Sequence, residues 1–140
     1  MIDQVTVFLE NDKGRLAALC RTLGDAGISM HALTVADTTN FGIARIIADT
    51  PAIANEILSK KGFRSSLTKV FAIEVSDVAG GLATLLEALD AADINVEYAY
   101  CFAVEGGHAI DIVKVDAHDE AEAVFEDAGF RVLRPEELYE

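Results

Sequence analysis

The loop at residues 11–15, Asn-Asp-Lys-Gly-Arg, joins an apolar stretch to a stretch with helical periodicity. The first amides of a helix have no intrahelical partner and carry partial positive charge, so a glycine there lets a small anion approach closely. Asp12 can cap the helix, Gly14 leaves the approach open, and Lys13 and Arg15 add positive charge. These features suit a carboxylate, and the Asn and Asp side chains of the loop could take an ammonium group. A glycine and a capping residue also simply begin helices, so ligand binding and an ordinary helix start both remain open.

The chain contains an internal repeat, which gives this loop a second copy. Residues 13–30, KGRLAALCRTLGDAGISM, align with residues 79–96, AGGLATLLEALDAADINV, at a spacing of 66 residues. Gly62 and Gly129 are 67 residues apart, which indicates one residue inserted in between. The second loop, residues 76–81, keeps glycines and capping candidates but has no basic residue. If only one of the two loops binds an anion, the first is favoured.

Each copy of the repeat predicts the order strand, helix, strand, strand, helix, strand. Alternating apolar residues indicate the strands, and apolar residues three and four apart indicate the helices. The βαββαβ order builds an antiparallel sheet with both helices on one face, the ferredoxin-like arrangement. The sequence therefore predicts an α+β fold of two tandem units, 1–70 and 71–140. The expected strands are 5–9, 28–35, 41–48 after a polar turn at 37–40, a short one ending near 70, and then 71–75, 94–102, 108–116 and 130–133.

The charge of the chain argues against two classes of partner. With 24 acidic and 11 basic side chains the formal net charge is −13, which repels nucleic acid and anionic lipid surfaces. No apolar run approaches the roughly 18 residues that span a bilayer, and the start MIDQVTVFLE lacks the features of a signal peptide. We expect a cytoplasmic protein that binds neither nucleic acid nor membranes.

The residues that most often carry catalysis or bind metals are scattered. Cys20 and Cys101 make neither a disulfide framework nor a metal motif, and Cys20 falls on the apolar stripe of a helix, which predicts a buried thiol. His31, His108 and His118 lie in different elements. Asp116, His118 and Asp119 fall at a strand end and a helix start, where helix capping explains them better than a metal site does. The sequence predicts no catalytic residue, no metal and no cofactor.

The second strand of each unit differs in composition. Tyr98 and Tyr100 are two residues apart and so lie on one face of their strand. Their hydroxyl groups could close over a polar ligand, or their rings could pack where the two sheets join. Both interpretations remain open.

Four sequence features occur together over residues 3–140: the start VFLENDKGRLA, the strand FGIAR, the strand INVEYAY and the ending EELY. In these features the chain resembles the stand-alone tandem ACT-domain proteins of bacteria. The resemblance implies two ACT units packed side by side into one extended antiparallel sheet with the helices on one face. Many members have proline before the loop glycine, whereas this chain has Lys13 and Ala79.

The resemblance also implies two ligand sites where the loop of one unit meets the second strand of the other. One site would use Asn11, Asp12, Gly14, Arg15 and Leu16 with Glu97, Tyr98, Ala99 and Tyr100. The pseudo-symmetric site would use Ser76, Asp77, Gly80, Gly81 and Leu82 with Met30, His31, Ala32 and Leu33.

The function that this family implies is regulatory rather than catalytic. We expect a sensor that binds a free amino acid between its units and signals allosterically, by a change of shape or association. The alternative is an interaction module that binds no ligand and regulates a separate metabolic enzyme by contact alone. Exposed sheet edges and a sheet face without helices favour a homodimer.

Overall fold

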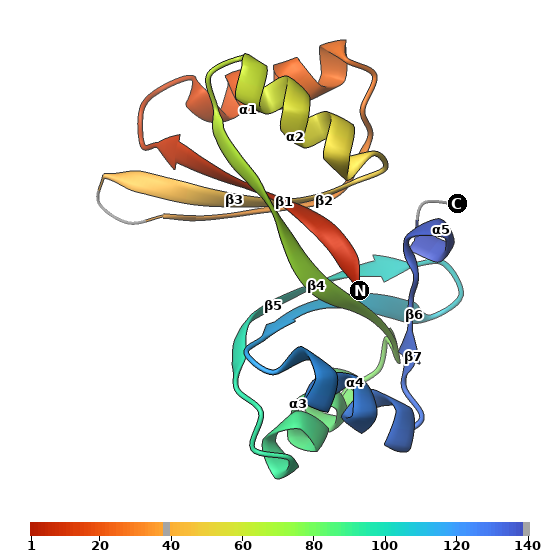
Figure 1. The fold of residues 1–140 in the computed structure, drawn as a ribbon. Helices are drawn as coiled ribbons and strands as arrows, with labels where there is room; N and C mark the ends of the chain where they lie inside the picture. Colours follow the sequence, from red (N-terminus) through yellow and green to blue (C-terminus); the bar gives the residue numbers. More distant parts are fainter. Residues whose placement is uncertain (38–39, 139–140) are drawn as a thin grey trace. The chain divides into compact units, whose positions relative to one another are not determined.

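The computed structural model describes residues 1–37 and 40–138 (Figure 1). Residues 38 and 39 of the expected polar turn lie outside the described residues, as do the last two residues of the expected second unit. The elements in chain order are β1 (Ile2–Glu10), α1 (Arg15–Asp25), β2 (Met30–Asp37), β3 (Phe41–Ala48), α2 (Pro51–Lys60), β4 (Arg64–Ser76), α3 (Gly81–Ala91), β5 (Val96–Val104), β6 (His108–Val115), α4 (His118–Asp127), β7 (Arg131–Val132) and α5 (Pro135–Leu138).

The chain divides into two compact units within β4. The first unit is Asp3–Thr68, and the second is Lys69–Leu138 together with Met1–Ile2. Strand β4 runs without a break through the division, so the two strands expected to end near residue 70 and to span 71–75 are one continuous strand. It therefore supplies the last strand of the first unit and the first strand of the second.

The same strand order occurs in both units. It is β2-β3-β1-β4 in the first unit and β5-β6-β4-β7 in the second, and the β1–β3, β2–β3, β4–β6, β5–β6 and β4–β7 pairs are antiparallel. The α+β class and the two βαββαβ units with antiparallel strands are thus confirmed.

Each unit has its own hydrophobic core, built from leucines at helical spacing and alternate residues of the strands. In the first unit Leu19 and Leu23 of α1 pack with strand residues such as Val7. In the second unit Phe71 meets Phe125 edge to face, with ring centroids 5.1 Å apart. Burial of one such large apolar side chain stabilises the fold by about 1.5–3 kcal/mol.

The predicted helix caps are wrong. Helix α1 has Gly14 as its N-cap residue, with no side-chain cap, because the backbone around Asp12 closes the turn instead. The Asp12 amide donates to the Glu10 carbonyl oxygen at 2.8 Å, and the Asp12 carbonyl oxygen accepts from the Arg15 amide at 3.3 Å. Helix α4 likewise has Ala117 as its N-cap residue and no side-chain cap. Its acidic first turn instead matches the partial positive charge of the helix start.

Two smaller expectations also need correction. The thiol of Cys20 is half-buried rather than buried, because it lies at the margin of the apolar stripe beside the fully buried Leu19. The chain ends in a short helix, α5, that the sequence analysis did not predict. Helix α2 begins at Pro51, since proline suits the first turn of a helix.

Candidate ligand cleft

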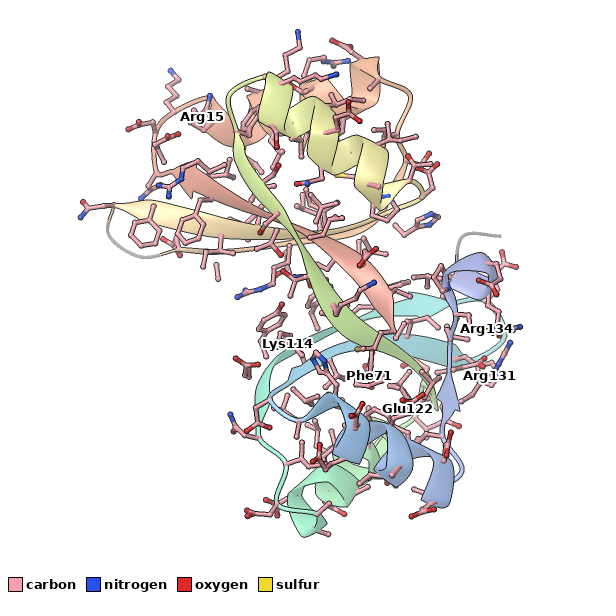
Figure 2. All side chains as sticks on the ribbon, viewed as in Figure 1. Arg15, Phe71, Lys114, Glu122, Arg131 and Arg134 are labelled. Atoms are coloured by element: carbon pink, nitrogen blue, oxygen red, sulfur yellow. The ribbon has the colours of Figure 1, made fainter. Side chains whose placement is uncertain are left out.

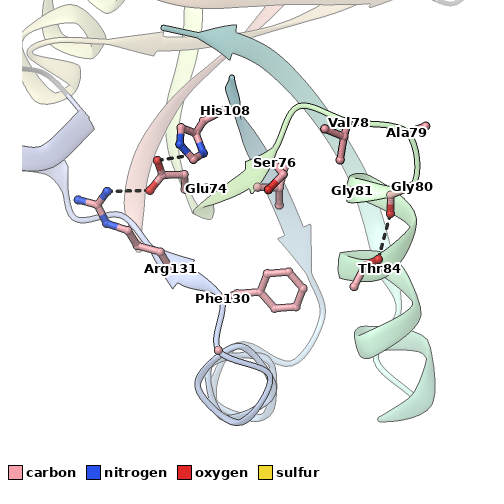
Figure 3. Close-up of a pocket in the computed structure, with 12 residues that line it drawn as sticks. Glu74, Ser76, Val78, Ala79, Gly80, Gly81, Thr84, His108, Phe130 and Arg131 are labelled. Atoms are coloured by element: carbon pink, nitrogen blue, oxygen red, sulfur yellow. Dashed lines mark hydrogen bonds and ion pairs between the residues drawn. The ribbon is translucent and has the colours of Figure 1, made fainter. Parts of the chain in front are cut away.

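An open cleft of about 540 Å³ lies in the second unit, at the end of β4 (Figure 3). Its lining comes from four segments: the end of β4, the loop into α3 with the first turn of that helix, the start of β6, and the residues around the start of β7. The volume falls within the range of about 300–1,000 Å³ that is usual for small-molecule sites.

Glycines shape the helix end of the cleft. Gly80 has φ 87°, a left-handed conformation that side chains rarely adopt, and it begins α3 without a side-chain cap. A Cβ atom at Gly81 would overlap the Ser76 carbonyl oxygen, so only glycine fits there without a backbone shift. The Gly81 amide donates to the Val78 carbonyl oxygen at 3.0 Å, and the Thr84 hydroxyl donates to the Gly80 carbonyl oxygen at 3.0 Å. These two hydrogen bonds fix the first turn of α3, whose Gly80, Gly81 and Thr84 line the cleft.

A group of charged side chains forms the opposite wall. Glu74 Oε2 accepts a hydrogen bond from Arg131 Nη1 at 2.7 Å, and Glu74 Oε1 lies 3.7 Å from His108 Nδ1. Arg131 also donates through Nη2 to Glu137 at 2.7 Å, outside the cleft. Hydrogen bonds from Arg134 and Arg131 lower the pKa of Glu137, and bonds to Glu137 and Glu74 raise the pKa of Arg131. The wall therefore offers a carboxylate and a guanidinium whose positions are fixed by one another.

The first unit has a smaller cleft at the equivalent place. It measures about 170 Å³ and is lined by Phe8, Leu9, Glu10, Phe41 and Arg64. By the repeat spacings of 66 and 67, these positions correspond in order to Glu74, Val75, Ser76, His108 and Arg131. All five of these counterparts line the larger cleft. The repeat has thus kept the position of the cleft while changing its chemistry.

In the wall of the first cleft, the aromatic rings of Phe8 and Phe41 stand at the positions of Glu74 and His108. The rings of Phe8 and Phe41 are 5.4 Å apart between centroids, and the Arg64 guanidinium lies over the Phe8 ring at 5.8 Å. At the helix end, Arg15 Nε donates to Glu10 Oε2 at 2.9 Å, and its guanidinium lies over the Phe63 ring at 4.5 Å. Figure 2 marks Arg15 at the start of α1.

Some of the loop residues predicted from sequence line the cleft of the second unit, but none of those in the first unit lines the smaller cleft. In the second unit Ser76, Gly80 and Gly81 line the cleft, while Asp77 and Leu82 are not part of its lining. The Asp77 amide donates to the Gly107 carbonyl oxygen, as the amide of Asn11 does to that of Asn40. In the first unit Asn11, Asp12, Gly14, Arg15 and Leu16 form the loop into α1 and its first turn.

The second-strand residues lie elsewhere in their units. Tyr98 and Tyr100 of β5 share a face, as predicted, with ring centroids 6.5 Å apart and nearly parallel planes. Glu97 accepts a hydrogen bond from Lys114 at 2.8 Å, and Ala99 is exposed between the tyrosines. On β2, Met30 packs against the core, while His31 and Leu33 are exposed and Ala32 is half-buried. None of these residues lines the described cleft of its own unit, and the pairing of each loop with the other unit's strand stays a prediction.

Sequence reasoning missed the wall of the cleft. Glu74, His108, Phe130 and Arg131 were not proposed as site residues, although they come together beside the predicted loop. Comparison of the two copies position by position could have singled them out. Phe8 and Phe41 of the first copy are replaced by Glu74 and His108 in the second. Phe130 and Arg131 are the same residue types in both copies.

Within residues 1–37 and 40–138, no group of three or more His, Cys, Asp or Glu side chains is placed to hold a metal ion. Over the same residues, no helix combines the length and apolar character needed to cross a membrane.

Comparison with known proteins places this fold. The family model for an ACT domain pair matches residues 1–140. A solved protein from Bacteroides thetaiotaomicron is 31% identical with a TM-score of 0.92, covering 99% of this chain and 95% of its own. No curated protein matches significantly.

Two more distant solved structures share the fold. The ligand-free regulatory subunit of aspartate kinase from Thermus thermophilus is 15% identical with a TM-score of 0.67, covering 91% of this chain and 90% of its own. The corresponding subunit from Thermus flavus is 14% identical with a TM-score of 0.62, and the match covers 90% of this chain and 91% of that subunit. From the whole-chain family match and the Bacteroides relative, the chain belongs to the ACT domain pair family.

Proposed function

We propose that this chain is a non-catalytic regulatory protein that binds a free amino acid. The observation that carries the proposal is the 540 Å³ cleft at the second loop, the counterpart in the repeat of the loop that the sequence analysis favoured for an amino-acid head group. Relatives in fold include regulatory subunits of aspartate kinase, which agrees with a regulatory role. The regulated partner would be a metabolic enzyme in the cytoplasm, and the predicted homodimer would be the form that responds to the ligand.

The cleft offers complementary groups for a zwitterion. The ligand carboxylate would lie against the start of α3, which carries partial positive charge and where the amides directly after Gly81 have no intrahelical acceptor, the Gly81 amide itself being bonded to Val78. The ligand ammonium would lie against Glu74, whose Oε2 accepts from Arg131 and whose Oε1 lies 3.7 Å from His108, so that lone pairs remain for the ligand. The side chain of the ligand would contact Phe130.

This assignment changes which loop is favoured. The basic residues of the first loop favoured it over the second, but Arg15 is paired with Glu10 at 2.9 Å and covers Phe63. Its charge is therefore already engaged. The second loop borders the larger cleft, and Glu74 stands there at the position that Phe8 has in the first unit, so we propose it as the main site. The sites that combine each loop with the second strand of the other unit stay a prediction.

A thermal-shift screen of the full chain against the common amino acids tests the proposal. A ligand at 100 times its dissociation constant stabilises the folded state by about 2.7 kcal/mol, which raises the melting temperature by roughly 5–15 °C at this chain length. We expect a selective shift with one or a few amino acids. The alternative, an interaction module that binds no ligand, predicts a folded protein with no shift from any of them.

Matched glycine variants locate the binding site. Gly80→Asp places a carboxylate where the ligand carboxylate would lie and should abolish the shift. Gly14→Asp makes the same change at the equivalent left-handed glycine of the first loop, with φ 90°, and should keep it. Loss of the shift in Gly14→Asp alone would move the site to the first loop.

A further inference from the structure

Arg15 and Gly81 occupy the same position in the two copies of the repeat, and this difference accounts for the unequal clefts. Each is the first residue of its helix and follows a left-handed glycine. The larger cleft also includes the loop into α3, the first turn of that helix and the residues Gly129 and Phe130 after α4. The counterparts of these residues do not line the smaller cleft. In the first unit, this is the place where the Arg15 guanidinium lies over Phe63.

Exposure of the two phenylalanines agrees with this account. Phe63 is buried, with 6% of its surface exposed, whereas its counterpart Phe130 is only partly buried and lines the cleft. Figure 3 shows the Phe130 ring pointing toward α3, between Ser76 and Thr84. Gly81 has no side chain that could take the place of Arg15, and a Cβ atom there would overlap the Ser76 carbonyl oxygen.

We propose that Arg15 closes the first cleft by imitating a ligand, and that the second cleft binds an amino acid whose cationic side chain lies on Phe130. This inference rests on the proposed function and names the class of ligand. A guanidinium over an aromatic face is attracted by the ring's negative charge distribution. The Ser76 hydroxyl stands at the position of Glu10 and can accept a hydrogen bond from the cation.

Charge around the cleft favours such a ligand. Glu74 and Ser76 lie two residues apart on the same face of β4, so the carboxylate is close to the position of the cation. The net charge of −13 also attracts cations to the protein as a whole. A ligand of the arginine type would therefore meet Glu74 with its ammonium group, Phe130 and Ser76 with its guanidinium, and the start of α3 with its carboxylate.

Calorimetric titration of the full chain with L-arginine and with L-citrulline tests the ligand class. The two molecules have nearly the same shape, but citrulline carries a neutral urea group in place of the guanidinium. We expect arginine to bind with one site per chain and citrulline to bind at least severalfold more weakly. If neutral amino acids bind as tightly as arginine, the inference fails while the proposed function stands. If no amino acid binds, both fail.

Substitution of the aromatic residues locates the cation. Phe130→Leu keeps an apolar side chain but removes the ring, and should weaken arginine binding by about two- to thirtyfold. The matched variant Phe63→Leu changes the first unit and should leave the arginine affinity unchanged. Equal affinities in Phe130→Leu and the unmodified chain would overturn the placement on Phe130.

The closed first cleft has its own test. Arg15→Ala removes the guanidinium while keeping a helix-forming residue, and should create a second site per chain for arginine or for methylguanidinium. Methylguanidinium should also raise the melting temperature of Arg15→Ala more than that of the unmodified chain. A variant that stays folded and shows neither effect would overturn the imitation of a ligand by Arg15.

Discussion

Asp111 of β6 and Cys101 of β5 are partners in the strand register, and the Cys101 thiol donates a hydrogen bond to the Asp111 carboxylate. Asp111 is only 1% exposed, and its Oδ2 has no hydrogen-bond partner among the described residues. The register partners at the equivalent positions of the first unit are Ala44 and Val35. One copy of the repeat thus buries a carboxyl group where the other buries a methyl group.

Replacement of this carboxyl group should stabilise the protein at neutral pH. Burial raises the pKa of Asp111, although the hydrogen bond from Cys101 lowers it in part. The folded chain therefore holds the proton more tightly than the unfolded chain, and stability is lost as the pH rises above the ordinary aspartate value of about 3.9. Asp111→Asn should be more stable than the unmodified chain by about 1 kcal/mol or more at pH 7, with the difference shrinking toward pH 4.

Urea denaturation of both proteins between pH 4 and pH 8 measures this difference. Asp90→Asn serves as control, because it removes the same charge from an exposed position of α3. Its effect should stay within about 0.5 kcal/mol over the whole range. A constant difference between Asp111→Asn and the unmodified chain would argue against titration of Asp111 as the cause.

The left-handed glycines at the helix starts should resist substitution even where space is available. A Cβ atom at Gly14 or Gly80 would meet nothing within 4 Å, so the cost of Gly80→Ala is the backbone conformation alone. That cost is about 1–2 kcal/mol for a residue with a side chain. Gly24→Ala, in the last turn of α1 and equally open, should instead stabilise by up to about 1 kcal/mol. Denaturant unfolding of the two variants should therefore give shifts of opposite sign.

The repeat made most of the fold predictable. Apolar residues at helical and strand spacing, such as Leu19 with Leu23, identified elements that the structure contains, and their recurrence at a fixed distance identified two equal units. These features depend on local periodicity, which a single sequence displays directly. The alternation of apolar residues did not show that the strands before and after residue 70 form one continuous strand, β4.

The helix caps and the wall of the cleft were not predicted correctly, because they depend on contacts that local sequence patterns do not reveal. Asp12 forms the hydrogen bonds of the turn before α1 with its backbone and not with its side chain. Its residue type therefore wrongly suggested a helix cap. The wall formed by Glu74, His108 and Arg131 comes from three segments that are distant in the sequence. Only the tertiary fold brings them beside the loop.

Removal of the charge of Glu74 separates its proposed role in binding from its role in the ion pair with Arg131. Glu74→Gln should weaken amino-acid binding by about tenfold or more, because a hydrogen bond to a charged group contributes about 1.5–3 kcal/mol. Its effect on the free energy of unfolding should stay below about 1 kcal/mol, since ion pairs near the surface contribute little.

Glu137→Gln is the matched control for this prediction. Glu137 is the other acceptor of Arg131, also at 2.7 Å, but it does not line the cleft. Both variants remove one carboxylate from the same guanidinium, so a loss of affinity that came from a displaced Arg131 would occur in both. Calorimetric titration of the two variants should instead show the loss in Glu74→Gln alone. Equal losses would mean that the carboxylate of Glu74 positions Arg131 and does not itself receive the ligand.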